Sequence, residues 1–181
     1  MSATIFATGE PQDIATVLAN KDHRVAQQDQ LMSRFPQQTI LASKLNIPGP
    51  VKNNAALEKI FAAGMADLRH RIPAGALRYE IWWHNPTGPE AFWVVNLEVS
   101  HSKQLGVAFE TDFPLGRFFD VDALTAATRD KPLSRADMGM PERSCFVCGR
   151  PAKECARSRR HSVAELQAAI DRAYLQYFSE G

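Results

Sequence analysis

The chain has 181 residues, of which 45% are hydrophobic, and a formal net charge of +1 at neutral pH. This balance is typical of a globular protein with a well-buried core, and it argues against a partner held by bulk electrostatic attraction, such as duplex nucleic acid. The most apolar run, residues 91–97, is too short to span a bilayer. We therefore expect a soluble, cytoplasmic protein that does not enter a membrane.

The first half of the sequence predicts a helix, then a strand and a second helix. Residues 12–35 carry apolar side chains near helical spacing without proline or glycine, which indicates one long or two short helices. Residues 39–47 predict a strand that stops at the Pro48-Gly49-Pro50 sequence. Asn53 or Asn54 is then placed to cap a helix that runs to about residue 71.

The middle of the sequence predicts a hairpin, a helix and another strand. Residues 76–84 and 91–99 are rich in aromatic and β-branched residues and flank a turn at residues 85–89. Ser100 or Ser102 is expected to cap a helix over residues 103–113, and residues 116–124 predict a strand. The order β-α-β-β-α-β is the split βαβ pattern of an α+β protein, with helices on one face of a four-stranded sheet.

The last third predicts a small unit that packs on the main one. A polar connector over residues 131–143 leads to a cysteine cluster, and a final helix follows with Ser162 as its cap and Glu165 as the reciprocal partner. We expect a main α+β domain over residues 1–140, which includes the N-terminal helical segment. Residues 141–181 would form a Cys/His element and a C-terminal helix.

All the cysteines of the chain, Cys145, Cys148 and Cys155, lie close together and are followed by His161. The spacing Cys-x2-Cys-x6-Cys-x5-His offers three thiolates and one imidazole, the ligand set that a structural Zn²⁺ accepts. Gly149 directly after the second cysteine favours the tight turn that chelation needs. The alternative is a group of reduced, partly buried thiols.

Asp120 and Asp122 are one residue apart in a predicted strand, so both carboxylates project from the same face. Such a pair is suited to Mg²⁺ or Mn²⁺ and to phosphoryl transfer, and Arg117 just before it offers a guanidinium to a polyphosphate. The alternative is a polar strand edge whose aspartates face water. Candidates for a third carboxylate are Glu80, Glu98 and Glu110.

A second candidate phosphate site is the Pro48-Gly49-Pro50 loop with Lys52, where a strand ends and a helix begins. Free backbone amides at a helix start favour anions, and Lys52 adds a positive charge. Gly49 and Lys52 are therefore candidate substrate-binding residues. The alternative is that the loop is only a turn. Arginines make the last third of the chain locally basic, which fits a solvated face, a phosphate or an acidic partner. They are Arg135, Arg143, Arg150, Arg157, Arg159 and Arg160.

Five ordered stretches of the sequence resemble the apo-citrate lyase phosphoribosyl-dephospho-CoA transferases, also called citrate lyase holo-acyl-carrier-protein synthases. They are residues 45–52, 87–91, 114–122, 133–135 and 141–163. Asn96 departs from the pattern, because an acidic residue is expected near this position in many relatives. No catalytic carboxylate is therefore assigned there.

The resemblance implies a nucleotidyltransferase-like enzyme that attaches a prosthetic group. Its substrate would be 2'-(5''-triphosphoribosyl)-3'-dephospho-CoA, its acceptor a serine of the acyl carrier (gamma) subunit of citrate lyase, and its by-product pyrophosphate. In such chemistry, positioning and charge stabilisation do most of the catalysis. We expect Asp120 and Asp122 to bind Mg²⁺, and Arg117 and Lys52 to contact the triphosphate with help from Arg135.

Two other functions stay open. A zinc-stabilised nucleic-acid-binding module would need exposed aromatic residues for base stacking, and none stands between Arg150 and His161. A lyase assembly factor would bind the carrier without modifying it. The carrier of a related enzyme, such as malonate decarboxylase, is an alternative target of the transferase.

Overall fold

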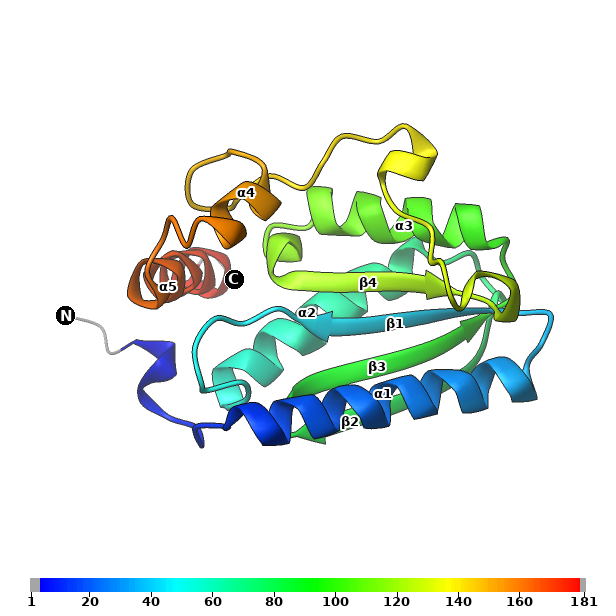
Figure 1. Ribbon diagram of the computed structural model, residues 1–181, viewed down its shortest axis with the longest axis horizontal. Coiled ribbons are helices and arrows are strands. Elements are labelled where there is room, and N and C mark those ends of the chain that lie inside the picture. The colour runs from blue at the N-terminus through cyan, green and yellow to red at the C-terminus, as the bar shows by residue number, and fades with distance from the viewer. Residues whose placement is uncertain (1–3, 180–181) are drawn as a thin grey trace.

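The computed structural model describes residues 4–179 (Figure 1). The outermost ends of the two predicted units, residues 1–3 and 180–181, lie outside this range. The main elements in chain order are α1 (Ile14–Arg34), β1 (Thr39–Leu45), α2 (Ala55–Arg71), β2 (Leu77–Asn85), β3 (Gly88–Val95), α3 (Val99–Asp112), β4 (Phe119–Leu124), α4 (Ala152–Arg157) and α5 (Val163–Ser179). Short 3-10 turns lie at Ile5–Ala7, Gly116–Phe118, Ala126–Thr128 and Ala136–Met138.

The four strands form one sheet in the order β2-β3-β1-β4, in which every neighbouring pair is antiparallel. Each β-α-β unit therefore joins two parallel strands that are separated by one antiparallel strand. This confirms the predicted split βαβ arrangement of an α+β protein. In this order β1 and β3 are central, while β2 and β4 are the edge strands.

Helices cover both faces of the sheet (Figure 1), which corrects the predicted arrangement with helices on one face: α2 and α3 lie on one face, and the N-terminal helix α1 covers the other. On one face Leu41 and Trp93 join the large core beneath α2 and α3, and on the other face Ile40 and Phe92 pack with residues of α1. Alternate residues of β1 and β3 point to opposite faces, so a strand covered on both sides is mostly apolar. Every residue of β3 is buried, and Glu90 is the charged one among them.

The structure corrects several predicted boundaries. Helix α3 begins at Val99, four residues before the predicted start, so Ser100 and Ser102 lie inside the helix and cap nothing. Ser102 is buried with the face of α3 that packs on β4, which shows that tertiary packing outweighed the local capping signal. Strand β3 ends at Val95 instead of residue 99, and Gly116–Phe118 forms a 3-10 turn instead of the start of a strand.

Two predicted helix caps are confirmed. The side chain of Asn54 accepts a hydrogen bond from the Leu57 N–H at 2.9 Å. Ser162 and Glu165 exchange reciprocal hydrogen bonds at the start of α5, as a capping box requires. From this start α5 runs along the main core, where Ile170 is fully buried. Among the described residues, no helix is long and apolar enough to cross a membrane.

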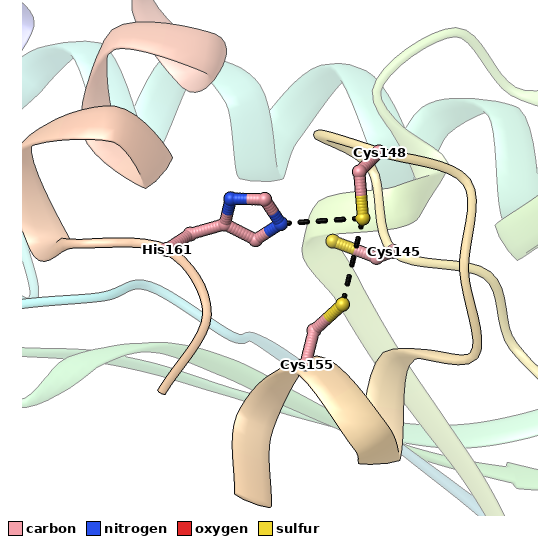
Figure 2. Close-up of side chains that lie close together, drawn as sticks. All are labelled: Cys145, Cys148, Cys155 and His161. Atoms are coloured by element: carbon pink, nitrogen blue, oxygen red, sulfur yellow. Dashed lines mark hydrogen bonds between the residues drawn. The ribbon is translucent and has the colours of Figure 1, made fainter. Parts of the chain in front are cut away.

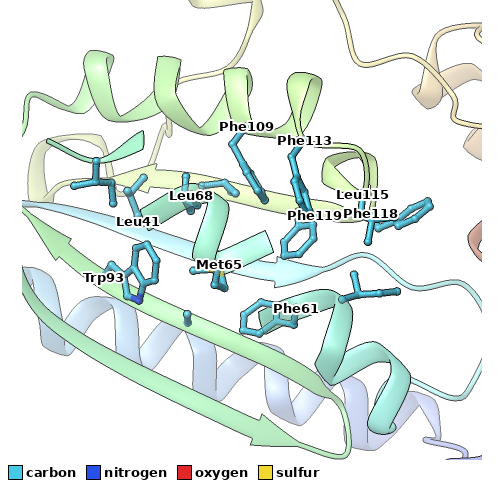
Figure 3. Packing of buried hydrophobic residues seen from close by; sticks show 14 of the residues in the cluster. Leu41, Phe61, Met65, Leu68, Trp93, Phe109, Phe113, Leu115, Phe118 and Phe119 are labelled. Atoms are coloured by element: carbon cyan, nitrogen blue, oxygen red, sulfur yellow. The ribbon is translucent and has the colours of Figure 1, made fainter. Parts of the chain in front are cut away.

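An aromatic cluster centred on Phe119 fixes β4 against α2 and α3 (Figure 3). The Phe119 ring stacks on Phe61 with 5.9 Å between centroids and meets Phe109 edge-on at 5.0 Å. Gly64 of α2 allows this close approach, because a Cβ at that position would overlap the Phe119 ring. The packing sets the position of β4, and β4 carries the candidate carboxylates.

Substitution of Gly64→Ala should lower the free energy of unfolding by about 1–3 kcal/mol, because the added Cβ would overlap the ring of Phe119, which is fully buried among other aromatic rings. The better helix propensity of alanine offsets only part of this loss. The control Ala62→Ser, at an exposed position of the same helix, should change the free energy of unfolding by no more than about 0.5 kcal/mol. Chemical denaturation of both variants provides the measurement, and a Gly64→Ala protein as stable as the control would contradict the packing argument.

Candidate functional site

The two aspartates of β4 lie on the sheet face toward α1, in an edge strand. Asp120 stands opposite Lys44 of β1, and Asp122 stands opposite Ala42. Phe119 and Val121, which alternate with them, point into the core on the other face. One face of β4 thus carries the two carboxylates, and the other face carries the apolar side chains that pack in the core, as the alternating sequence predicts.

Asp120 is held by two cations. One carboxylate oxygen accepts from Lys44 Nζ at 2.7 Å, and the other accepts from the Arg143 guanidinium at 2.8 Å. Burial alone would raise the pKa of Asp120, but the charges and hydrogen bonds of Lys44 and Arg143 outweigh it and hold the pKa below its usual value. Asp120 is therefore an ionised carboxylate at neutral pH.

Glu110 of α3 lies beside this pair and is almost fully buried. It accepts from the Val121 N–H at 2.9 Å, from Arg135 at 2.6 Å and from Arg143 at 2.7 Å. Of the three glutamates that the sequence offered as a third carboxylate, Glu110 is the one next to the aspartates. Glu80 is paired instead with Arg69, and Glu98 stands at the start of α3.

Asp122 is the accessible carboxylate of the group, with 55% of its side chain exposed. Its nearest cation is Lys103, whose Nζ lies 3.9 Å away. Burial of the carboxyl group against the protein raises the pKa of Asp122, with Lys103 opposing the rise and the charge of Asp120 adding to it. These side chains line a cavity of about 310 Å³, here called the carboxylate cavity, together with Arg135, Arg143 and Lys153.

Arg117 lies in the 3-10 turn before β4 and is half-buried. It forms no ion pair with any residue that the structure describes. Burial lowers the pKa of Arg117, and the positive charges of Arg143 and Arg135 lower it further. Three guanidinium groups therefore lie near one another, and this arrangement attracts an anion with several negative charges.

Arg117 and Arg143 also border a second cavity of about 560 Å³, here called the junction cavity. It lies where the β1–α2 loop, the 3-10 turn of Arg117 and the C-terminal element meet. Arg143 lines both cavities, so the two cavities are neighbours.

Lys52 and Gly49 line neither of these cavities. The Lys52 amino group donates to the Ile47 carbonyl at 2.6 Å, and burial followed by the charge of Lys44 lowers its pKa. Gly49 has φ +85°, and a Cβ there would meet Gln167 and Val163 of α5. The amide side chain of Asn54 donates to the Ile5 carbonyl, so the N-terminal segment lies against the start of α2.

Arg143 and Lys44 are site residues that the sequence analysis did not single out. Arg143 was visible only as one arginine of a basic region, and its pairing with Asp120 joins residues 23 positions apart. Lys44 becomes recognisable once the register of β1 and β4 is known. Lys44 also stands opposite Glu90 of the neighbouring strand β3. The buried Glu90 side chain accepts hydrogen bonds from Asn20 at 2.6 Å and from Arg24 at 2.9 Å.

The side chains of Cys145, Cys148, Cys155 and His161 converge on one point (Figure 2). Their ligand atoms all lie within 4.8 Å of one another. Cys148 Sγ lies 3.5 Å from Cys155 Sγ and 3.3 Å from His161 Nε2. A tetrahedral zinc with bonds of about 2.0–2.3 Å separates its ligand atoms by roughly 3.5–3.8 Å, so the cluster fits a structural metal.

Local structure explains why these four residues meet. The turn from Cys145 closes through the Gly149 N–H, which donates to the Cys145 carbonyl at 2.8 Å, and Gly149 adopts φ +73°. Helix α4 then presents Cys155 to the turn. Hydrogen bonds from the Arg150 N–H and from His161 lower the pKa of Cys148 to about 6, so a thiolate is available at neutral pH.

The side chains of Asp120 and Asp122 are less suitably arranged for binding a metal ion than the Cys/His cluster is. In the part of the chain that the structure describes, no other group of three His, Cys, Asp or Glu side chains converges in the same way. Asp122 has free oxygen atoms, whereas Asp120 already has a cation on each oxygen. A cation that used both carboxylates would have to displace Lys44 or Arg143 from Asp120.

Comparison with known proteins assigns the chain to a family. The model of the family described as apo-citrate lyase phosphoribosyl-dephospho-CoA transferase matches residues 12–177. A Streptococcus pyogenes protein named "Probable apo-citrate lyase phosphoribosyl-dephospho-CoA transferase" is 31% identical over 181 residues, which cover 99% of this chain and 94% of that protein. A Vibrio cholerae protein of the same name is 36% identical over 86% of this chain and 87% of its own length.

A longer relative contains a similar sequence as one part of its chain. The protein named CitXG from Leuconostoc mesenteroides subsp. cremoris is 34% identical over 92% of this chain, and the match covers 36% of that protein. The match to the family model and the two near full-length relatives agree with the resemblance seen in the five sequence stretches. The chain belongs to the apo-citrate lyase phosphoribosyl-dephospho-CoA transferase family.

Proposed function

We propose that this chain transfers the phosphoribosyl-dephospho-CoA group from 2'-(5''-triphosphoribosyl)-3'-dephospho-CoA to a serine of the apo acyl carrier subunit of citrate lyase. Family membership supports a transferase of this kind. The observation that carries the assignment to this site is the group of Arg117, Arg135 and Arg143, which lines two neighbouring cavities. A triphosphate is the part of the substrate that such a group attracts.

The charges of the site suit the reaction. Arg117 lacks a carboxylate partner among the described residues, and Arg135 and Arg143 are held in place by the buried Glu110. Guanidinium groups that are already positioned stabilise the charge of a leaving pyrophosphate without reorganising. The roles of Lys52 and Gly49 in substrate binding stay predictions.

In the proposed reaction, the serine oxygen attacks the phosphorus nearest the ribose and the bond from that phosphorus to the pyrophosphate breaks. The serine proton leaves with a base, and pyrophosphate carries away the electron pair of the broken bond. We propose Asp122 and Asp120 as the residues that hold Mg²⁺ or Mn²⁺, which supplies charge neutralisation at the phosphate oxygens when bound. Movement of Arg143 from Asp120 to a phosphate oxygen would free one Asp120 oxygen for this purpose.

We propose further that Cys145, Cys148, Cys155 and His161 hold a structural Zn²⁺. The exposed Arg150, Arg157 and Arg160 lie on the same element and offer a basic surface to an acidic carrier. Reduced thiols are kept in the cytoplasm, which is where we place the reaction. The division into units at residue 140 stays a prediction.

The intact mass of purified apo carrier should increase by the mass of the phosphoribosyl-dephospho-CoA group after incubation with the protein, Mg²⁺ and the triphosphoribosyl substrate. Pyrophosphate should appear in equal amount. An unchanged carrier that co-purifies with the protein would indicate an assembly factor instead. Salt-sensitive retention of RNA or DNA on a filter, without carrier modification, would favour the nucleic-acid-binding alternative.

Substitution of Asp122→Asn should lower kcat by about ten- to a hundredfold while the melting temperature stays the same, because the side chain is 55% exposed and its ion pair with Lys103 is long, at 3.9 Å. The matched control is Asp112→Asn, an exposed carboxylate at the end of α3 that lines neither cavity. Titration with Mn²⁺, followed by electron paramagnetic resonance, should show weaker binding in the first variant alone. Normal Mn²⁺ binding and turnover in Asp122→Asn would remove this residue from the metal site.

Protein purified without chelators should contain about one zinc ion per chain by elemental analysis. Cys155→Ser should lose the metal and make the chain after residue 140 sensitive to protease, because folding of the element then lacks its ligand. His101→Gln, a histidine exposed on α3, should retain it. A zinc-free protein whose C-terminal element resists protease would contradict the proposed structural site.

A further inference from the structure

The junction cavity has no assigned ligand in the transfer chemistry described above. With a volume of about 560 Å³ it lies within the size range of small-molecule sites, whereas the reacting phosphates need only the charged groups at its border. Its wall is built from segments far apart in sequence, namely the β1–α2 loop at Asn46 and Pro48, the turn of Arg117 and the start of α5. Such a space fits a part of the substrate that does not react.

Apolar side chains form much of the wall. Phe146, Val163 and Leu166 line the cavity together with Ala152 and Ala156. Phe146 packs edge-on against the buried Phe118, with 5.3 Å between the ring centroids. The contact holds the Phe146 ring against the main core, so this part of the wall is rigid.

Charged and polar groups mark the ends of the same wall. Arg143 lines both the junction cavity and the carboxylate cavity, and Arg117 and Arg159 line the junction cavity. The amide side chain of Asn46 also lines the cavity and makes no hydrogen bond within residues 4–179. An asparagine amide offers both a donor and an acceptor, the pair that matches the edge of an adenine ring.

We propose that the junction cavity binds the adenosine part of the substrate's dephospho-CoA moiety. This assignment rests on the proposed function and adds the position at which the adenine ring of the substrate binds. The triphosphate-bearing ribose is joined directly to the adenosine ribose, whereas the pantetheine arm is separated from it by a diphosphate. With the triphosphate at Arg143, adenine is the flat aromatic group separated from it only by the two riboses, and its ring faces suit the apolar wall of the junction cavity.

The test fills the cavity from an exposed position. Ala156→Phe places a ring in the cavity from the surface of α4, and Ala164→Phe makes the same change at an exposed position of α5 that does not line it. Binding of dephospho-CoA, measured by calorimetry, should weaken at least tenfold in Ala156→Phe and stay unchanged in Ala164→Phe. The KM for the triphosphoribosyl substrate should rise by a similar factor, with kcat retained. Melting temperature and zinc content show whether each variant is folded.

Two smaller probes identify which part of the substrate occupies the cavity. AMP should lose affinity in Ala156→Phe, while 4'-phosphopantetheine should bind the two variants equally. The reverse result would overturn the proposal and place the pantetheine arm there. Unchanged dephospho-CoA affinity and KM in a folded Ala156→Phe would also overturn it, and normal transfer by the parent protein would then leave the proposed function standing. Absence of transfer by the parent protein would reject the proposed function, whereas selective loss of AMP binding would still support the adenosine site.

Discussion

The outer edge of β4 imposes the constraint on which the site depends, because an edge strand presents backbone groups that need partners. The Val121 N–H donates to Glu110 at 2.9 Å, and the Val121 carbonyl accepts from Lys103 at 3.4 Å. The Phe119 carbonyl accepts from Arg143 at 2.8 Å. The side chains that cover this edge are the ones that line the carboxylate cavity. The same side chains therefore satisfy the backbone groups of the edge strand and line the candidate site.

Opposite charges alternate across this region. Lys44 pairs with Asp120, Asp120 with Arg143, Arg143 with Glu110, and Glu110 with Arg135. Glu110 is the buried member, and loss of one partner of a buried pair leaves an uncompensated charge, which costs about 3–5 kcal/mol. Because carboxylates lie between them, the guanidinium groups can lie close together without strong mutual repulsion. Through Arg143, these ion pairs also hold the chain two residues before Cys145.

The C-terminal element connects metal binding to the shape of the junction cavity. Cys145, Cys155 and His161 belong to the Cys/His cluster drawn in Figure 2, and they also line that cavity. Beyond the cluster, the buried Ile170 of α5 joins the core beneath the sheet. A metal held by the cluster would therefore stabilise both the attachment of α5 and one wall of the proposed adenosine site.

The sequence by itself determined the order of the elements, the alternation of Asp120 and Asp122 with apolar residues, and the spacing of the cysteine cluster, because each is a pattern within one continuous segment. Only the tertiary structure decided that Lys44 stands opposite Asp120, that Glu110 is the neighbouring glutamate, and that Arg143 joins two cavities. Strand register and the return of a distant segment depend on packing of the whole core, and no local pattern encodes them.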